Sequence, residues 1–209
     1  MTEKDINTII AIFDKHAEQY AERYADMSAY SEAIWHFMDH PAPNPKILDI
    51  ACGPGNLLGL ILEDIEDAEV TGIDLSTSML DIARSRFPQG RFLELDMRDI
   101  NELGDTFDRI SCGFGLPYIS LEELDTWISN VYKRLASKGR VYLSTMVKKE
   151  ASTQLVLPSS GKGKGVNTSY YTQDLLVNNL EKCGFDIEFQ AFFKTDSPEL
   201  QDYVVVASK

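Results

Sequence analysis

The sequence has few cysteines, few basic residues and no long apolar run. Its three cysteines, Cys52, Cys112 and Cys183, form no CxxC pair. This spacing argues against a disulfide framework or a cysteine zinc site and favours a reducing cytoplasm. A membrane span needs about 18 consecutive apolar residues, and the polar, acidic start MTEKDINTII is unlike a signal peptide. We therefore expect a cytoplasmic protein that does not enter a membrane.

Positive charge is scarce as well. The chain has 33 Asp and Glu against 20 Lys and Arg, a formal net charge of −13. Such a surface repels phosphate backbones, so we expect no nucleic-acid partner; the short stretch Lys162–Lys164 is the one basic candidate. A composition of 44% hydrophobic and 25% charged residues in 209 residues is typical of one globular domain.

The first 45 residues predict a helical cap on a larger core. Apolar residues recur at helical spacing from residue 5, and the helical pattern extends to residue 38. The segment PAPNP (41–45) then ends it, because proline breaks helices and restricts the residue before it. We divide the chain into a cap over 1–45 and a core over 46–209.

The core alternates short apolar strands with helices, which predicts a parallel sheet covered on both faces. A helix over 172–182 and two final strands around Ser197-Pro198 predict an antiparallel hairpin at the C-terminal end. The expected fold is α/β and Rossmann-like, with a mostly parallel seven-stranded sheet. Its strands are expected over 46–51, 69–74, 91–96, 107–112, 139–146, 185–193 and 201–208. Its other helices are expected over about 56–66, 77–86 and 121–136, with a short turn near 98–103.

The stretch between the fifth strand and the next helix is rich in Gly, Ser and Lys over 157–169. Such a composition predicts a mobile segment, and we expect a loop over 147–171 that acts as a lid. The sequence GKGKG (161–165) does not fit the phosphate-loop pattern G-x-x-x-x-G-K-[ST]. A flexible hinge is therefore favoured over an anion site.

A ligand site is expected where the strands end. The stretch ILDIACGPGNLL (47–58) places Gly53 and Gly55 between a strand and a helix, where the backbone turns sharply and approaches a ligand closely. Asp49, Asp74 and Asp96 lie at or near the ends of successive strands. Carboxyl ends of parallel strands share one edge of the sheet, so these groups are expected to converge on one nucleoside-shaped site.

Two cofactor classes use such a turn. A dinucleotide fingerprint, G-x-G-x-x-G, needs a third glycine, but Leu58 occupies that position. A nicotinamide-dependent oxidoreductase therefore stays a weaker alternative.

The core contains four motifs in order, ILDIACGPGNLL, VTGIDLSTSML, FLELDMRDI and FDRISCGFGLPYI. They resemble those of the class I S-adenosylmethionine-dependent methyltransferases that act on small molecules. FDKHAEQYAERY (13–24) resembles the helix that caps the cofactor in this family, and YYTQDLLVNNLEKCGF (170–185) resembles the helix before the terminal hairpin. The resemblance implies methyl transfer from S-adenosyl-L-methionine, with S-adenosyl-L-homocysteine as product.

The resemblance also implies the residues that bind the cofactor. Asp74 is expected at the ribose, Asp96 and Met97 at the adenine with Met79 nearby, and Tyr20 over the cofactor. The complete expected set is Tyr20, Asp49, Ala51, Cys52, Gly53, Gly55, Asn56, Asp74, Leu75, Met79, Asp96, Met97, Cys112, Gly113 and Phe114.

Departures from the family pattern bear on the acceptor. Ala51 stands where glycine is common, and residues 113–118 read GFGLPY instead of Asn/Asp-Pro-Pro-Tyr, which argues against DNA amino-group and glutamine N-methylation. A small-molecule acceptor is expected first and a peptide or protein second. Tyr24, Tyr118 and Tyr171 are candidates for its pocket.

No side chain is assigned a catalytic role. An amine or thiolate acceptor needs no general base, whereas a hydroxyl acceptor does; the candidate bases are the tyrosines and His16, His36 and His40. His36 and His40 have a metal-ligand spacing, but Pro41 disfavours a helix there, and no metal is expected. Cys52 and Cys112 are expected to pack as apolar residues. A protein that binds S-adenosylmethionine or its product without catalysis is the second alternative.

Overall fold

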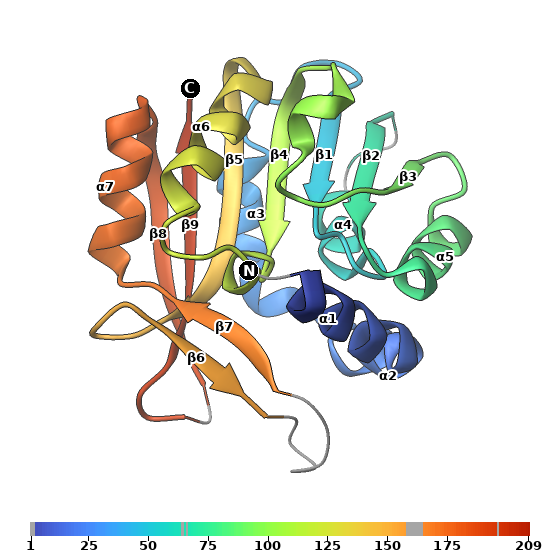
Figure 1. The fold of residues 1–209 in the computed structure, drawn as a ribbon. Coiled ribbons are helices and arrows are strands. Elements are labelled where there is room, and N and C mark those ends of the chain that lie inside the picture. The colour runs from blue at the N-terminus through green and yellow to red at the C-terminus, as the bar shows by residue number, and fades with distance from the viewer. Residues whose placement is uncertain (1–2, 64, 66, 158–164, 196) are drawn as a thin grey trace.

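The protein is built on one seven-stranded sheet (Figure 1). The computed structural model describes residues 3–63, 65, 67–157, 165–195 and 197–209. The strand order is β3-β2-β1-β4-β5-β9-β8. The first five strands in this order pair in parallel, and β9 pairs antiparallel with β5 and with β8. The predicted mostly parallel sheet with a C-terminal antiparallel hairpin is therefore confirmed. Its strands are β1 (Lys46–Ile50), β2 (Glu69–Asp74), β3 (Arg91–Glu94), β4 (Phe107–Gly113), β5 (Leu135–Val147), β8 (Asp186–Lys194) and β9 (Gln201–Ser208).

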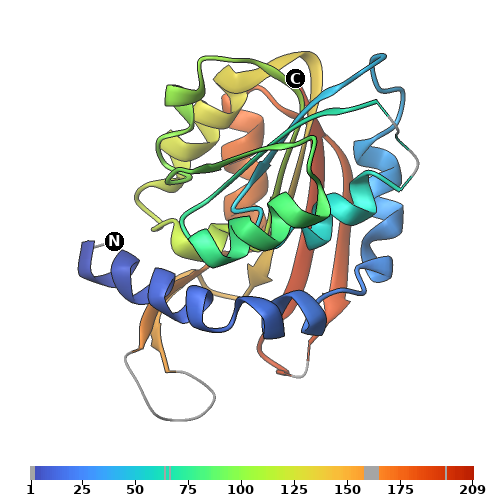
Figure 2. The same ribbon diagram turned by 90° about the vertical axis from the view of Figure 1, so that its right-hand side faces the viewer.

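Helices cover both faces of this sheet. Helices α6 and α7 cover one face, and α3, α4 and α5 cover the other (Figures 1 and 2). Their buried side chains belong to the apolar clusters on these faces. No helix in the described ranges is long and apolar enough to cross a membrane. The helices of these layers are α3 (Ser31–Phe37), α4 (Asn56–Ile61), α5 (Thr77–Arg86), α6 (Leu124–Arg134) and α7 (Gln173–Cys183), with 3-10 turns η2 (Ile100–Leu103) and η3 (Leu116–Tyr118).

Two further helices, α1 (Glu3–Lys15) and α2 (Ala17–Arg23), lie across the carboxyl ends of β1, β2 and β4 (Figures 1 and 2). The helical pattern expected over 5–38 is confirmed, but it is divided into separate helices, because the chain bends at His16 and again between α2 and the 3-10 turn η1 (Ser28–Tyr30). These bends let α1 cover the sheet edge while α3 packs its apolar side on the sheet.

The segment over 147–171, expected as a loop, is partly a hairpin of β6 (Ser152–Val156) and β7 (Val166–Tyr170). An isolated parallel bridge joins Tyr171 to Val147 at the end of β5. Backbone pairing and this bridge outweigh the turn-forming composition that suggested a loop. Of the stretch expected to be mobile, residues 158–164, which hold most of GKGKG, lie outside the described residues.

Two helices are shorter than their sequence patterns indicate. The helix expected over about 56–66 ends at Ile61. The helix expected over 121–136 spans 124–134, because the buried Leu135 already belongs to β5 and pairs with Phe107 of β4.

Candidate functional site

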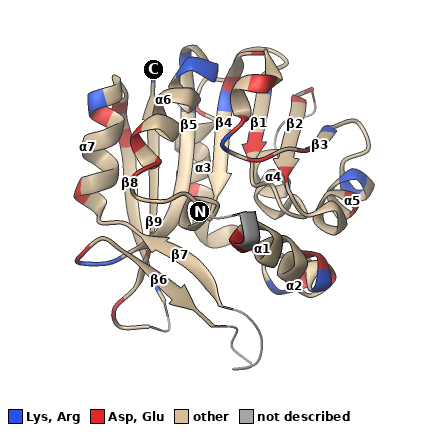
Figure 3. Cartoon of the chain, in the orientation of Figure 1, with Lys and Arg blue, Asp and Glu red and all other residues tan. Residues whose placement is uncertain are grey.

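The floor of the candidate site is the contact between the glycine turn after β1 and Asp74 at the end of β2. Acidic positions mark the carboxyl ends of both strands (Figure 3). The Asp74 carboxylate accepts the backbone N–H of Gly53 and that of Ser76, both at 2.9 Å. Gly53 has φ +54°, and a Cβ on it would meet no heavy atom within 4 Å. The turn therefore presents open backbone beside a fixed carboxylate.

The C-terminal part of the turn, Gly55 and Asn56, is fixed by contacts with α5 and α2. A Cβ on Gly55, at φ +80°, would lie 2.7 Å from the Phe87 ring, so only glycine fits between the turn and α5. The Asn56 amide donates to the carbonyls of Ala21 and Tyr24 at 3.2 and 2.9 Å. These bonds tie the start of α4 to α2. Gly55 and Asn56 were both predicted to bind the cofactor, but neither lines the cavity described below.

Asp49 lies beneath the turn and is 1% exposed. Its Oδ1 accepts from the Ser111 hydroxyl at 2.6 Å, while Oδ2 has no partner among the described residues. Burial raises the pKa of the Asp49 carboxyl to about 7; the Ser111 bond opposes this shift and the charge of Asp74 adds to it. Burial also raises the pKa of the Cys52 and Cys112 thiols. None of these three predicted residues lines the cavity.

A cavity of about 100 Å³ opens above this floor, at the edge where the strand order reverses between β1 and β4. In α/β sheets, ligands bind at such a switch point. The structure brings most of the predicted cofactor residues to this cavity. They are Tyr20, Ala51, Gly53, Asp74, Leu75, Met79, Asp96, Met97, Gly113 and Phe114, joined by the acceptor candidate Tyr118.

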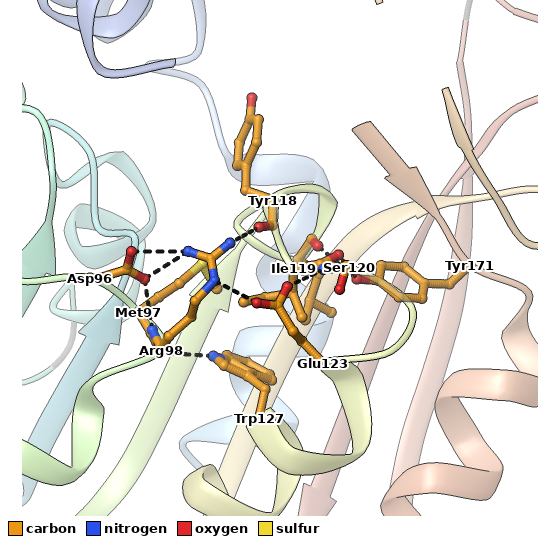
Figure 4. Close-up of polar contacts among 10 residues, drawn as sticks. Asp96, Met97, Arg98, Tyr118, Ile119, Ser120, Glu123, Trp127 and Tyr171 are labelled. Atoms are coloured by element: carbon orange, nitrogen blue, oxygen red, sulfur yellow. Dashed lines mark hydrogen bonds and ion pairs between the residues drawn. The ribbon is translucent and has the colours of Figure 1, made fainter. Parts of the chain in front are cut away.

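The sequence reasoning missed Arg98, which lines the same cavity and connects three segments (Figure 4). Its Nη1 contacts both Asp96 carboxylate oxygens, at 2.8 and 3.0 Å. Its Nε donates to Glu123 at 3.2 Å, and its Nη2 donates to the Tyr118 carbonyl. The guanidinium therefore fixes the loop after β3 against η3 and the start of α6. Its position two residues after the predicted adenine-site acid was the available indication.

Two buried side chains hold the same loops from the other side. The Trp127 indole donates to the Met97 carbonyl at 2.9 Å. The Tyr171 hydroxyl lies 2.8 Å from the Leu116 carbonyl and 2.6 Å from that of Ile119 (Figure 4). Tyr171 has no exposed surface, packs in the main apolar core and does not line the cavity described here, contrary to its expected place in an acceptor pocket.

Aromatic rings of the cap form the upper wall. The Phe13 ring lies 5.8 Å from Tyr20 and 5.8 Å from Tyr118, edge to face in both pairs. Burial raises the pKa of Tyr20 to about 12 and also raises that of Tyr118, so both hydroxyls stay protonated at neutral pH. Tyr24 packs on the outer side of Tyr20, is 45% exposed and does not line the cavity, contrary to expectation.

None of the three histidines lines this cavity. His16 contacts the Gln19 side chain, and the His36 ring stacks on Phe189 at 4.5 Å. His40 follows the end of α3 in a left-handed conformation, at φ +47°. Within the described ranges, no group of three or more His, Cys, Asp or Glu side chains is placed to hold a metal ion.

Comparison with known proteins identifies similar sequences and folds. Residues 47–139 match a family described as "Methyltransferase domain". A demethylmenaquinone methyltransferase of Symbiobacterium thermophilum is 30% identical over 62% of this chain, which spans only 55% of that relative's length. A ubiquinone/menaquinone biosynthesis C-methyltransferase of Campylobacter jejuni is 24% identical over 93% of this chain and 91% of its own. A crystal structure of an S-adenosylmethionine-dependent methyltransferase of Methanosarcina mazei has the same fold, with a TM-score of 0.68 and 18% identity over 82% of this chain and 95% of that one.

Proposed function

Because the chain belongs to the class I S-adenosylmethionine-dependent methyltransferase family, we propose that it transfers a methyl group from S-adenosyl-L-methionine to a small molecule. The observation that carries this proposal is the meeting of the Gly53 turn, Asp74 and Asp96 at one cavity. A nucleoside needs acceptors for its ribose hydroxyls and close backbone approach, and this edge of the sheet offers both.

The residues present fit this cofactor. Each Asp74 oxygen accepts one backbone N–H, which leaves further acceptor capacity for ribose hydroxyls. The open space at Gly53 lets a ligand's polar groups approach the backbone of the turn closely. Asp96 and Met97 would hold the adenine, and Tyr20 would cover the cofactor.

When bound, the cofactor supplies a methyl group already activated on a positively charged sulfur. The protein's own task is then to orient the two reactants and exclude water. Near-attack positioning alone is worth roughly 7–11 kcal/mol. The walls that would do this come from α1 and η3, through Phe13 and Tyr118.

The cavity lining points to an acceptor that needs no general base. No histidine lines it, and the hydroxyls of Tyr20 and Tyr118 hold their protons. All three nitrogens of the Arg98 guanidinium donate to protein acceptors, and its charge is paired with the carboxylates of Asp96 and Glu123. An amine fits these conditions best, with a thiol second and a peptide amine as the larger alternative.

The proposed function also includes roles for the cap and the 147–171 segment and a location for the enzyme. Residues 1–45 act as a cap that closes on the core over 46–209, and the segment over 147–171 borders the acceptor entrance. The enzyme works in the cytoplasm on a diffusible acceptor and needs neither nucleic acid nor membrane.

The test combines binding with transfer. S-adenosylhomocysteine at a hundred times its Kd should stabilise the protein by about 2.7 kcal/mol, a rise in Tm of about 5–10 °C, whereas NADH should give none. Methyl-labelled S-adenosylmethionine should then label compounds in a pool of small amines. Stabilisation without any transfer would favour the non-catalytic binding protein, and stabilisation by NADH alone would favour an oxidoreductase.

A further inference from the structure

The cap helix α1 is joined to α5 by one carboxylate. Asp14 Oδ1 accepts from the Ser76 hydroxyl at 2.6 Å and from the Ser78 backbone N–H at 3.1 Å. Ser76 is 1% exposed, and its hydroxyl oxygen also accepts the Met79 N–H at 3.2 Å as the N-cap of α5. Asp14, on α1, therefore satisfies part of the amide donors in the first turn of α5. A negative charge is favourable at this N-terminal end of a helix.

This joint continues directly into the proposed cofactor site. The Ser76 backbone N–H donates to Asp74 Oδ1, and the Gly53 N–H donates to Asp74 Oδ2. A chain of hydrogen bonds thus runs from the glycine turn through Asp74 and Ser76 to Asp14. Ser76 thus donates both to Asp74, the expected ribose-binding acid, and to Asp14 of the cap.

The same helix supplies apolar wall to the cavity. Ile6, Ile9 and Phe13 line it, and α1 packs otherwise against α5 and β7. Movement of this helix away from the sheet edge would widen the cavity for entry or exit of a ligand. The bonds of Asp14 are made at the C-terminal end of α1, directly after Phe13.

The Asp14 carboxylate is ionised in this joint. Partial desolvation acts to raise its pKa, but the hydrogen bonds from Ser76 and Ser78 outweigh that effect and lower it. Bonds to an ionised acceptor are stronger than neutral ones. Asp14 therefore contributes more to holding α1 than a neutral polar residue would.

We propose that Asp14 is a positioning residue of the cofactor site, which holds α1 closed over the cavity and acts through Ser76 on the loop that carries Asp74. The part that concerns the cofactor rests on the function proposed above; the closure of α1 does not.

The first experiment measures closure without any ligand. Backbone hydrogen exchange is compared between the wild type, Asp14→Ala and the matched control Glu18→Ala, which removes the same charge from the exposed side of α2. Asp14→Ala removes both hydrogen bonds of the Asp14 carboxylate and should speed exchange over residues 3–15 by at least about tenfold, with the strands unchanged. If Asp14→Ala exchanged over residues 3–15 at the wild-type rate, or if its exchange increased uniformly with the strands included, the proposal would be overturned.

The second experiment measures the coupling with S-adenosylhomocysteine as the probe. Asp14→Ala should speed its dissociation by about tenfold in stopped flow, whereas Glu18→Ala should leave the rate unchanged. Ser76→Ala should also speed dissociation, and the double variant should show less than the product of the two effects, because both substitutions break one joint. Independent effects, or no change in the rate, would overturn the role of Asp14 at the site.

The two experiments fail in different ways. If wild-type protein does not bind S-adenosylhomocysteine at all, the proposed function fails, and the exchange experiment still decides whether Asp14 holds α1. If the probe binds but Asp14→Ala changes neither exchange nor dissociation, the proposed function stands and this inference falls.

Discussion

Asp74 accepts the backbone N–H of Gly53 at 2.9 Å across 21 residues of sequence. The acid that ends one strand thereby sets the position of the glycine turn that follows the neighbouring strand. Because strands β1 and β2 pair in parallel, their ends are adjacent and this bond is short-range in space. A loss of Asp74 would therefore remove a ligand acceptor and loosen the turn together.

Asp74→Ala should weaken S-adenosylhomocysteine binding by about 1–3 kcal/mol for each hydrogen bond lost. Titration calorimetry on the wild type and the variant measures this difference. Asp81→Ala is the matched control, because that carboxylate lies on α5 with a side chain 75% exposed. Equal Kd values for the wild type and Asp74→Ala would exclude Asp74 from the binding site.

The free energy of unfolding should depend on pH through Asp49. Burial raises the pKa of this carboxyl to about 7 in the folded protein, against about 3.9 in an unfolded chain. The folded state then binds more protons between these values, so the contribution to stability is present at low pH and is lost as pH rises through about 7. The direction at Asp74 is the same.

Urea unfolding at pH 5 and pH 7.5 isolates this effect. Wild-type stability should decline over this interval by about 1–3 kcal/mol more than that of Asp49→Asn. The amide is neutral throughout and still offers an oxygen to the Ser111 hydroxyl. The same decline in both proteins would show that Asp49 does not titrate in this range.

Arg98→Gln should destabilise the fold more than removal of a surface arginine. The Arg98 side chain is 23% exposed and bonds to Asp96, Glu123 and the Tyr118 carbonyl. Removal of one partner of a partly buried ion pair should cost about 2–3 kcal/mol. Arg91→Gln, whose pair with Asp105 is exposed, should change the unfolding free energy by less than about 0.5 kcal/mol. Equal small changes in denaturant midpoint would remove Arg98 from any structural role.

Tyr171→Phe distinguishes a structural tyrosine from an acceptor-binding one. The variant leaves the carbonyls of Leu116 and Ile119 without this donor, at a cost of about 1–3 kcal/mol. Tyr24→Phe, an exposed position, should be neutral within about 0.5 kcal/mol. Thermal unfolding of both variants gives the comparison. A neutral Tyr171→Phe variant would return this residue to the list of acceptor candidates.

The strands of the sheet were predicted well from the sequence, because the residues that mark each strand are adjacent in the chain. Each buried strand is a short apolar run, and the glycine turn at Gly53 and Gly55 is visible in the letters themselves. The helical pattern over 5–38 is confirmed, but nothing local in the sequence marks the bend at His16, where α1 ends and α2 begins. The same holds for Tyr171, whose hydroxyl contacts carbonyls 55 and 52 residues away that spacing does not reveal.

Parts of the candidate site depended on contacts between distant residues. Arg98 meets Glu123 and Tyr118 across 25 and 20 residues, and the Asp14–Ser76 bond spans 62. A motif indicates which positions face a ligand, but it does not indicate which distant residues hold those positions in place. Asn56 illustrates this, since a position within the first motif bonds to α2 instead of lining the cavity.

Trp127 gives the protein an optical reporter. The chain has two tryptophans; Trp35 is 65% exposed, whereas Trp127 is buried and donates its indole N–H to the carbonyl of Met97, a cavity residue. In a Trp35→Phe background, the remaining emission comes from a fluorophore bonded to the wall of the site. A change in its wavelength or intensity would then follow each ligand entry and departure in real time, without any label.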